Sequence, residues 1–215
     1  MKISVVTTLY RSAPFLPEFY RRMKETLIGL NVEFEFVVVD DGSPDEALTI
    51  TKDLVANEDT EYCIVELARN FGHHPAMMAG LEHAQGDRVF LIDCDLEEDP
   101  ELLVDFQRRM NDEDLDVIYG VQQQRKGNWF EQWSGAVFYW LFNLLSTHEI
   151  PPNLCTVRLM SADYVKALVL HKDRSLFLPG LWAITGFKQS KHLIVKHARE
   201  ASTYTFAHRF AMLVD

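Results

Sequence analysis

Consecutive apolar residues alternate with amphipathic segments along the first half of the chain. Unbroken apolar runs are typical of strands buried on both faces of a parallel sheet, whereas apolar residues three to four apart are typical of helices. This alternation predicts βαβ units and a single α/β domain with a mostly parallel sheet. The predicted strands cover 3–7, 34–39, 63–67, 89–92 and 117–119, and the predicted helices cover 14–28, 75–85 and 100–110, with another that opens at Ser43.

Two boundary signals refine these helices. Ser43 is followed by Pro44 and by Glu46, which predicts a capping box with serine as the N-cap and proline at the first helical position. Gly86 follows the periodic segment 75–85, so we expect it to end that helix.

The second half of the chain has a different pattern. Residues 128–146 are rich in Trp, Phe, Tyr and Leu and carry almost no charge, which predicts one long, largely apolar helix. Such a helix is either buried in a core or lies at a membrane interface, where Trp and Tyr are favoured. Residues 161–170 predict another helix, and no run of about 18 apolar residues predicts a membrane span.

Composition and charge narrow the class of protein. A chain of 215 residues that is 47% hydrophobic and 25% charged is typical of one globular domain. The net charge of −11 argues against a general nucleic-acid binder. Three cysteines without paired spacing and the absence of a signal sequence favour the cytoplasm. Because the chain stops within helix-like sequence, we expect a domain over 1–200 and, over 201–215, the truncated start of a juxtamembrane segment.

The most informative polar residues are Asp93 and Asp95, which flank Cys94 directly after an apolar run. Open α/β sheets bind ligands at the carboxyl ends of their strands. Two neighbouring carboxylates favour Mg²⁺ or Mn²⁺, which usually keeps positions open for phosphate oxygens. The pair predicts a metal site for a diphosphate-bearing substrate, although a solvated turn is the simpler interpretation.

Three motifs together resemble those of the family 2 glycosyltransferases of GT-A fold. They are Val-Asp-Asp-Gly-Ser at 39–43, Arg-Asn-Phe-Gly at 69–72 and Asp-x-Asp-Leu at 93–96. The branch that they resemble most is the dolichol-phosphate mannose synthase group, which includes bacterial polyprenyl-phosphate glycosyltransferases. The resemblance runs from residue 3 to about 204 and implies a Rossmann-like, mostly parallel sheet with helices on both faces.

The resemblance also implies roles for particular residues. It implies a nucleotide-sugar donor, a divalent cation held by Asp95 and Asp93, and inversion at the anomeric carbon. Asp40 and Asp41 match the acidic pair that contacts the base and ribose, and Arg69 matches a residue near the diphosphate. The implied nucleotide-sugar-binding set is Thr8, Tyr10, Asp40, Asp41, Arg69 and Asp93, and the implied catalytic set is Asp93, Asp95, Arg125 and Arg158.

Two departures from the family pattern bear on the acceptor. Thr156 stands where the family has an aspartate, and Thr203 stands where it has a lysine. A sugar hydroxyl generally needs a carboxylate base, whereas a lipid phosphate is already anionic at neutral pH. We therefore expect a polyprenyl-phosphate acceptor and keep a saccharide acceptor as the alternative. Three acidic residues remain open as bases: Glu97, Glu98 and Asp99.

Aromatic and basic residues favour action at a membrane surface, on the cytoplasmic face. The aromatic segment supplies Trp129, Trp133, Phe138, Tyr139, Trp140 and Phe142, and a later basic cluster supplies Lys188, Lys191, His192, Lys196, His197 and Arg199. Apolar side chains beside basic ones are typical of an interfacial anchor.

Two other function classes remain in view. Thr156 and Thr203 would also suit a non-catalytic nucleotide-sugar-binding relative, which the intact aspartate pair disfavours. A nucleotidyltransferase would carry a glycine-rich phosphate loop near the N-terminus, and residues 7–15 contain no glycine. The sugar, the nucleotide and the oligomeric state are not specified by the sequence.

Overall fold

The computed structural model describes residues 1–56, 60–123, 153–171 and 178–197. Within these ranges one seven-stranded sheet has the order β3-β2-β1-β4-β6-β5-β7. The strands are β1 (Lys2–Leu9), β2 (Glu33–Asp40), β3 (Glu61–Glu66), β4 (Arg88–Leu91), β5 (Val117–Gln122), β6 (Leu154–Ser161) and β7 (Gln189–Ile194).

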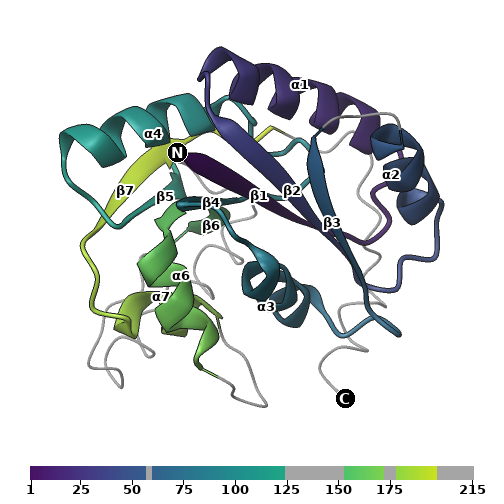
Figure 1. The fold of residues 1–215 in the computed structure, drawn as a ribbon. Coiled ribbons are helices and arrows are strands. Elements are labelled where there is room, and N and C mark those ends of the chain that lie inside the picture. Colours follow the sequence, from purple (N-terminus) through teal and green to yellow (C-terminus); the bar gives the residue numbers. More distant parts are fainter. Residues whose placement is uncertain (57–59, 124–152, 172–177, 198–215) are drawn as a thin grey trace.

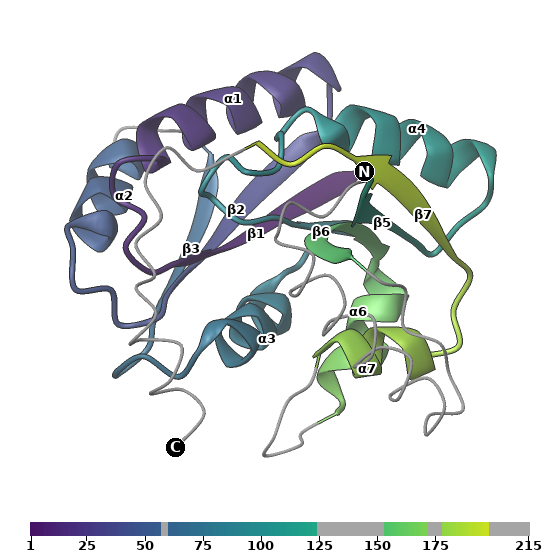
Figure 2. The same ribbon diagram turned by 180° about the vertical axis from the view of Figure 1, so that it is seen from behind.

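Helices cover both faces of this sheet. One layer holds α1, α2 and α4 and the other holds α3, α6 and α7, and both layers are also visible from behind (Figures 1 and 2). The helices are α1 (Leu16–Gly29), α2 (Ala47–Val55), α3 (His73–His83), α4 (Leu102–Asp112), α6 (Ala162–Val169) and α7 (Leu178–Ile184). None of the described helices is long and apolar enough to cross a bilayer.

The sheet is parallel except at β6. Strands β1, β2, β3 and β4 pair in parallel, as do β5 and β7, whereas β6 pairs antiparallel with both β4 and β5. In this register Arg158 of β6 lies between Leu91 of β4 and Tyr119 of β5. The start of β6 therefore lies at the same edge of the sheet as the ends of the parallel strands.

Alternate side chains of the central strands enter two separate cores. Phe90 packs in the cluster with α1 and α4, and its neighbour Leu91 packs in the cluster with α3 and α6. Because successive side chains of a strand point to opposite faces, an unbroken apolar run satisfies both cores. The α/β architecture predicted from the alternating pattern is confirmed.

The predicted start of α2 is wrong. The helix begins at Ala47 with Glu46 in the N-cap position, and no side chain caps it. The Ser43 hydroxyl instead contacts the Asp45 carboxylate and accepts a hydrogen bond from the Arg11 amide. The Ser43 hydroxyl therefore has Asp45 and Arg11 as partners, and it does not cap the helix.

The predicted bounds of α3 are also wrong. The helix begins two residues earlier, at His73, and ends at His83 without a glycine cap. Gly86 lies beyond the helix, where a Cβ atom would come within 2.6 Å of the Ser4 amide nitrogen. This glycine is required by the close approach of the loop to β1, rather than by the end of the helix.

Three elements of the second half were not predicted: β6, α7 and β7. The helix predicted over 161–170 is present as α6, and the Ser161 hydroxyl caps it by accepting a hydrogen bond from the Tyr164 amide. The predicted helix over 128–146 and the predicted segment over 201–215 lie outside the described residues.

Candidate functional site

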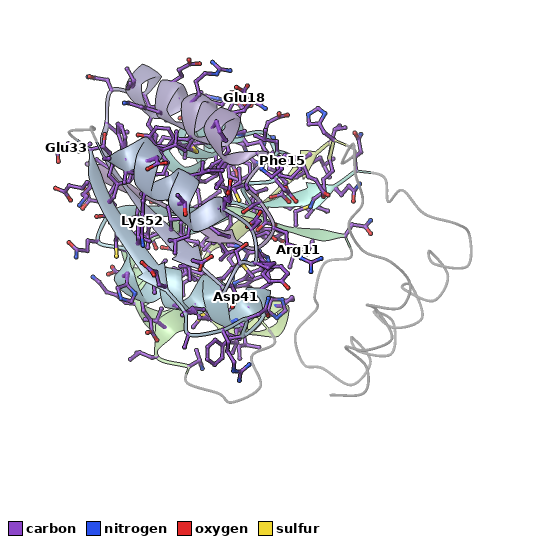
Figure 3. All side chains as sticks on the ribbon, turned by 90° about the vertical axis from the view of Figure 1, so that its right-hand side faces the viewer. Arg11, Phe15, Glu18, Glu33, Asp41 and Lys52 are labelled. Carbon is purple, nitrogen blue, oxygen red and sulfur yellow. The ribbon has the colours of Figure 1, made fainter. Side chains whose placement is uncertain are left out.

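The predicted site residues follow the ends of neighbouring strands. Asp40 ends β2 and pairs with Leu9 of β1, and Asp93 follows β4 by two residues. In Figure 3 the labels of Glu33 and Asp41 mark opposite ends of β2, and Arg11 lies at the Asp41 end. The structure thus brings the β1, β2 and β4 motifs to one edge of the sheet.

Asp41 ties the β2 motif to the loop that precedes α3. One carboxylate oxygen accepts a hydrogen bond from the Phe71 amide at 2.7 Å and the other accepts one from the Gly72 amide at 3.0 Å. The Asp41 side chain is buried, and its own amide donates to the Leu9 carbonyl at 3.1 Å. Both carboxylate oxygens therefore fix the loop before α3, whether or not they also contact a ligand.

Gly42 allows the β2 and β3 loops to touch. Its φ is +61°, and a Cβ atom there would lie 2.7 Å from the backbone of both Arg69 and Asn70. Only glycine combines this backbone conformation with so close an approach. The two glycine-containing motifs singled out in the sequence are thus packed directly on each other.

Asp40 and Asp45 complete the polar lining of this loop. Asp40 accepts a hydrogen bond from the Ser43 amide at 3.1 Å, and Asp45 accepts one from the Ala13 amide at 2.9 Å. Burial raises the pKa of Asp40, and the nearby carboxylates of Glu66, Asp41 and Asp45 raise it further. Asp40 is therefore an acidic group that a polar hydrogen-bond donor would stabilise.

Asp93 is joined to β1 through a histidine that we did not select from the sequence. His73 Nε2 lies 3.4 Å from Asp93 Oδ1, and His73 Nδ1 lies 3.3 Å from the Thr8 hydroxyl. Both partners were predicted site residues. A histidine that directly follows Arg-Asn-Phe-Gly at a helix start was the signal available in the sequence.

Asp95 lies in a tight turn. Its Oδ1 accepts a hydrogen bond from the Glu97 amide at 3.0 Å, and the intervening Leu96 has a φ of +60°. Cys94 points inward, where its thiol donates to the Thr8 carbonyl at 3.4 Å, and burial raises the pKa of this thiol to about 12. The inward cysteine leaves the two flanking aspartates partly exposed.

Glu98 is a fully buried carboxylate beside the aspartate pair. Its Oε2 accepts a hydrogen bond from the Val157 amide at 3.0 Å, and its Oε1 lies 3.0 Å from Lys196 Nζ. Burial raises the pKa of Glu98, and the charge of Lys196 opposes this effect. The pair joins the loop after Asp95 to β6 and to the end of β7.

The neighbouring carboxylates also have cationic partners. Glu97 lies 3.6 Å from Lys196 Nζ, and Asp99 lies 2.7 Å from Arg22 and 2.9 Å from His197. The three acidic residues considered as bases are all held by positive groups. Lys196 and His197, which were predicted to belong to a basic surface, both contact carboxylates of this loop.

Arg158 is buried, with 1% of its surface exposed. Its guanidinium donates to the carbonyls of Thr156 and Cys155, both at 3.1 Å, and lies 3.0 Å from the centre of the Trp182 ring. Burial lowers the pKa of Arg158 to about 10. Arg158 thus supplies a positive charge beneath the surface, held by the carbonyls of Thr156 and its neighbour.

The remaining predicted residues lie at the rim or outside the described residues. Arg69 is exposed, with its guanidinium 4.2 Å from the Phe71 ring centre, and Tyr10 is half-buried. Arg125 lies outside the described residues, as do Arg199 and Thr203. Trp182 was not selected from the sequence, because α7 carries no motif that points to the site.

Two carboxylates at the end of β4 are candidates to hold a divalent cation. Asp93 and Asp95 offer two partly exposed carboxylates, and among the described residues no group of three His, Cys, Asp or Glu side chains is placed to hold a metal. Mg²⁺ is commonly held by one or two carboxylates, with substrate phosphates and water filling its other positions. The pair fits a cation that binds together with a diphosphate.

Comparison with known proteins agrees with this geometry. Residues 4–169 match the family described as Glycosyl transferase family 2. A protein of Mycobacterium tuberculosis (strain CDC 1551 / Oshkosh) with only a general glycosyltransferase name is 45% identical over the whole chain. The undecaprenyl-phosphate 4-deoxy-4-formamido-L-arabinose transferase of Enterobacter sp. (strain 638) is 30% identical, also over the whole chain. The chain spans 63% of the first relative and 66% of the second, so it falls just short of two thirds of their length.

A solved structure confirms the predicted fold. The mannosyltransferase PcManGT of Pyrobaculum calidifontis, in complex with GDP-Man and Mn²⁺, aligns with a TM-score of 0.63 at 16% identity. The alignment covers 98% of this chain and 60% of that one. The GT-A fold predicted from the motifs is therefore confirmed, and the chain belongs to glycosyl transferase family 2.

Proposed function

We propose that this chain is the catalytic domain of an inverting, metal-dependent glycosyltransferase. Its donor is a nucleotide-diphosphate sugar, and its acceptor is a polyprenyl phosphate at the cytoplasmic face of a membrane. The observation that supports the acceptor assignment is that the carboxylates near Asp93 and Asp95 are paired with Lys or Arg side chains. These carboxylates are Glu97, Glu98 and Asp99.

The donor side rests on the shared edge of the sheet. Thr8, Tyr10 and Asp40 line the end of β1 and β2, where the base and ribose bind, while Asp41 also fixes the adjoining loop. Asp93 and Asp95 would hold Mg²⁺ or Mn²⁺, which supplies positive charge for the departing diphosphate. Exposed Arg69 adds a second positive group close to the same strand ends.

The acceptor side lacks an obvious protein base within the described residues. Thr156 replaces the family aspartate, and Glu97, Glu98 and Asp99 are each paired with a Lys or Arg side chain. An acceptor hydroxyl would have to lose its proton to one of these, whereas a phosphate monoester is already anionic. The phosphate oxygen can therefore attack the face of the sugar opposite the diphosphate without a base.

Positive groups and a relative support the phosphate acceptor. The structure places Arg158 beneath the carbonyls of Thr156 and Cys155, and Arg125 remains the proposed phosphate contact beyond the described residues. The relative named as an undecaprenyl-phosphate transferase matches the whole chain. Lipid specificity is proposed for the aromatic segment over 129–142.

A saccharide acceptor is the second candidate, and one observation favours it. Lys196 and His197 are bound to the acidic loop, so the basic cluster attracts an anionic membrane less than its sequence suggests. Along β7 and just after it, Lys191, Leu193 and Val195 are exposed, and two of these three side chains are apolar.

A direct competition separates the two acceptors. The chain is supplied with a labelled nucleotide sugar, Mn²⁺, a short-chain polyprenyl phosphate in detergent, and free oligosaccharides. We expect label in the lipid phosphate fraction, and flotation with anionic vesicles that is lost at high salt. Transfer to a free saccharide, with no vesicle binding at low salt, would support the second candidate and overturn the first.

A further inference from the structure

His73 occupies a position that the surrounding loops determine closely. It is the first residue of α3 and follows Gly72, whose φ is +98°. The amides of Phe71 and Gly72 are both held by the buried Asp41 carboxylate. The start of α3 is therefore anchored to the end of β2, and the His73 ring is set relative to the sheet.

The ring bridges the ends of two other strands. Its Nδ1 lies 3.3 Å from the hydroxyl oxygen of Thr8 on β1, and its Nε2 lies 3.4 Å from Oδ1 of Asp93 after β4. Asp93 is 25% exposed and His73 is 44% exposed, so the contact lies at the surface of the candidate donor site. Both ring nitrogens face a residue that was predicted to bind the donor.

One arrangement of protons fits these contacts. With the Thr8 hydroxyl as donor to Nδ1, the proton of the ring is on Nε2, which faces Asp93 Oδ1 across 3.4 Å. A ring whose second nitrogen is fixed by a hydrogen bond has its tautomer set by that bond. The ring then restrains Oδ1 of Asp93, and Oδ2 is the oxygen that we assign to the cation.

We propose that His73 is a positioning residue that orients Asp93 for the divalent cation. This inference rests on the proposed function. The contact of His73 is with Oδ1 of Asp93, so the proposed role is to orient this carboxylate rather than to bind the cation. Outer partners of this kind typically change metal affinity or activity about 10–100-fold when they are removed.

Three substitutions at position 73 distinguish an effect of the Nε2–H group from an effect of side-chain size. His73→Gln can place an amide N–H near the position of Nε2, whereas His73→Asn reaches only the position of Nδ1, and His73→Ala reaches neither. His83→Gln is the matched control, because His83 is exposed at the other end of α3 and contacts the Ala79 carbonyl of its own helix.

The measurement is the affinity for Mn²⁺ in the presence of UDP or GDP, followed by the electron paramagnetic resonance signal of free Mn²⁺. We expect binding to weaken about 10–100-fold in His73→Ala and His73→Asn, and less than about threefold in His73→Gln and His83→Gln. Melting temperatures without metal should match the wild-type value. Thr8→Val provides a second variant, and we expect it to weaken Mn²⁺ binding less than His73→Ala does.

The outcomes separate this inference from the function on which it rests. Wild-type affinity in His73→Ala, or equal weakening in all three His73 variants, would overturn the role of the Nε2–H group alone. A wild-type chain that binds no Mn²⁺ with either nucleotide would overturn the metal site and the positioning role together.

Discussion

The charged side chains around the candidate site are held differently on its two sides. In the half formed by β3, β2, β1 and β4, Asp41 and Asp95 accept hydrogen bonds from backbone amides of their own or a neighbouring loop. On the side that faces β6, β5 and β7, two charged side chains are buried. Arg158 is buried against Trp182, and Glu98 is buried against Lys196.

This difference separates two tasks. Asp95 stays partly exposed at a strand end, where a ligand can reach it, whereas the buried Asp41 fixes the loop before α3. Buried charges depend strongly on their partners, because an unpaired charge in a core is costly. The parallel half thus presents the proposed donor-binding groups, and the antiparallel strand β6 and its neighbours contact the loop after Asp95 from one side.

Removal of the buried carboxylate should give the largest loss of stability. Glu98→Ala leaves Lys196 with one distant partner at 3.6 Å and leaves the Val157 amide unpaired. We expect the free energy of unfolding in urea to fall by about 3–5 kcal/mol. Asp163→Ala is the control, since the exposed Asp163–Lys166 pair should contribute less than about 0.5 kcal/mol. Similar effects of both variants would refute the contrast.

Removal of Lys196 should make stability depend more strongly on pH. Burial, opposed by the charge of Lys196, raises the pKa of Glu98 to about 7. A carboxyl whose folded pKa lies above its unfolded value favours folding when protonated, and this contribution is lost as the pH rises through the folded pKa. Lys196→Met removes the charge that opposes this rise, so the pKa of Glu98 should rise further. The destabilisation relative to the wild type should therefore grow between pH 5 and pH 8 in urea titrations. A constant difference would show that the two groups are not coupled.

A methyl group at Gly42 should disturb the donor side. Gly42→Ala places Cβ 2.7 Å from two backbone atoms and keeps a left-handed φ, so we expect a loss of about 2 kcal/mol or more. Gly29→Ala is matched, because nothing lies within 4 Å of its Cβ position. Equal melting temperatures for the two variants would argue against close contact of the β2 and β3 loops.

Loss of the Asp41 tether should have a smaller effect on folding and a clear one on the donor. Asp41→Asn keeps one oxygen acceptor for the amides of Phe71 and Gly72, and we expect about 1 kcal/mol of lost stability. Asp41→Ala should weaken nucleotide-sugar binding by about 1–3 kcal/mol, measured by calorimetry. A fall in metal affinity without a fall in nucleotide affinity would contradict the assignment.

The parallel half was predictable because its signals are local. Each strand is a short apolar run, and each motif directly follows its strand, so topology alone brings Asp40 and Asp93 to one edge. The wrong helix start in this half arose because other groups compete for the hydrogen bonds of the predicted capping residue. Ser43 has a capping pattern, yet its hydroxyl is engaged by Arg11 and Asp45, and only the folded structure brings the Arg11 amide to it.

The other half depends on contacts between distant residues. Strand β6 includes Arg158, which interrupts the apolar pattern and becomes buried only because Trp182 covers it. Lys196 belongs to a run that resembles a solvated basic cluster, and its partner Glu98 is almost 100 residues away. His73 was missed for the same reason, since its contacts with Thr8 and Asp93 cross between strands.

The central claim is that Asp93 and Asp95 form a cation site used by a nucleotide sugar. The most direct test is thermal stabilisation of the wild-type chain and of Asp95→Ala by UDP-, GDP- and dTDP-sugars, with Mn²⁺ or with excess chelator. Binding to the folded state raises apparent stability by mass action. We predict that at least one donor raises the melting temperature only with Mn²⁺, and that Asp95→Ala melts like the wild type but loses this rise. An equal rise in chelator, or in Asp95→Ala, would contradict the claim.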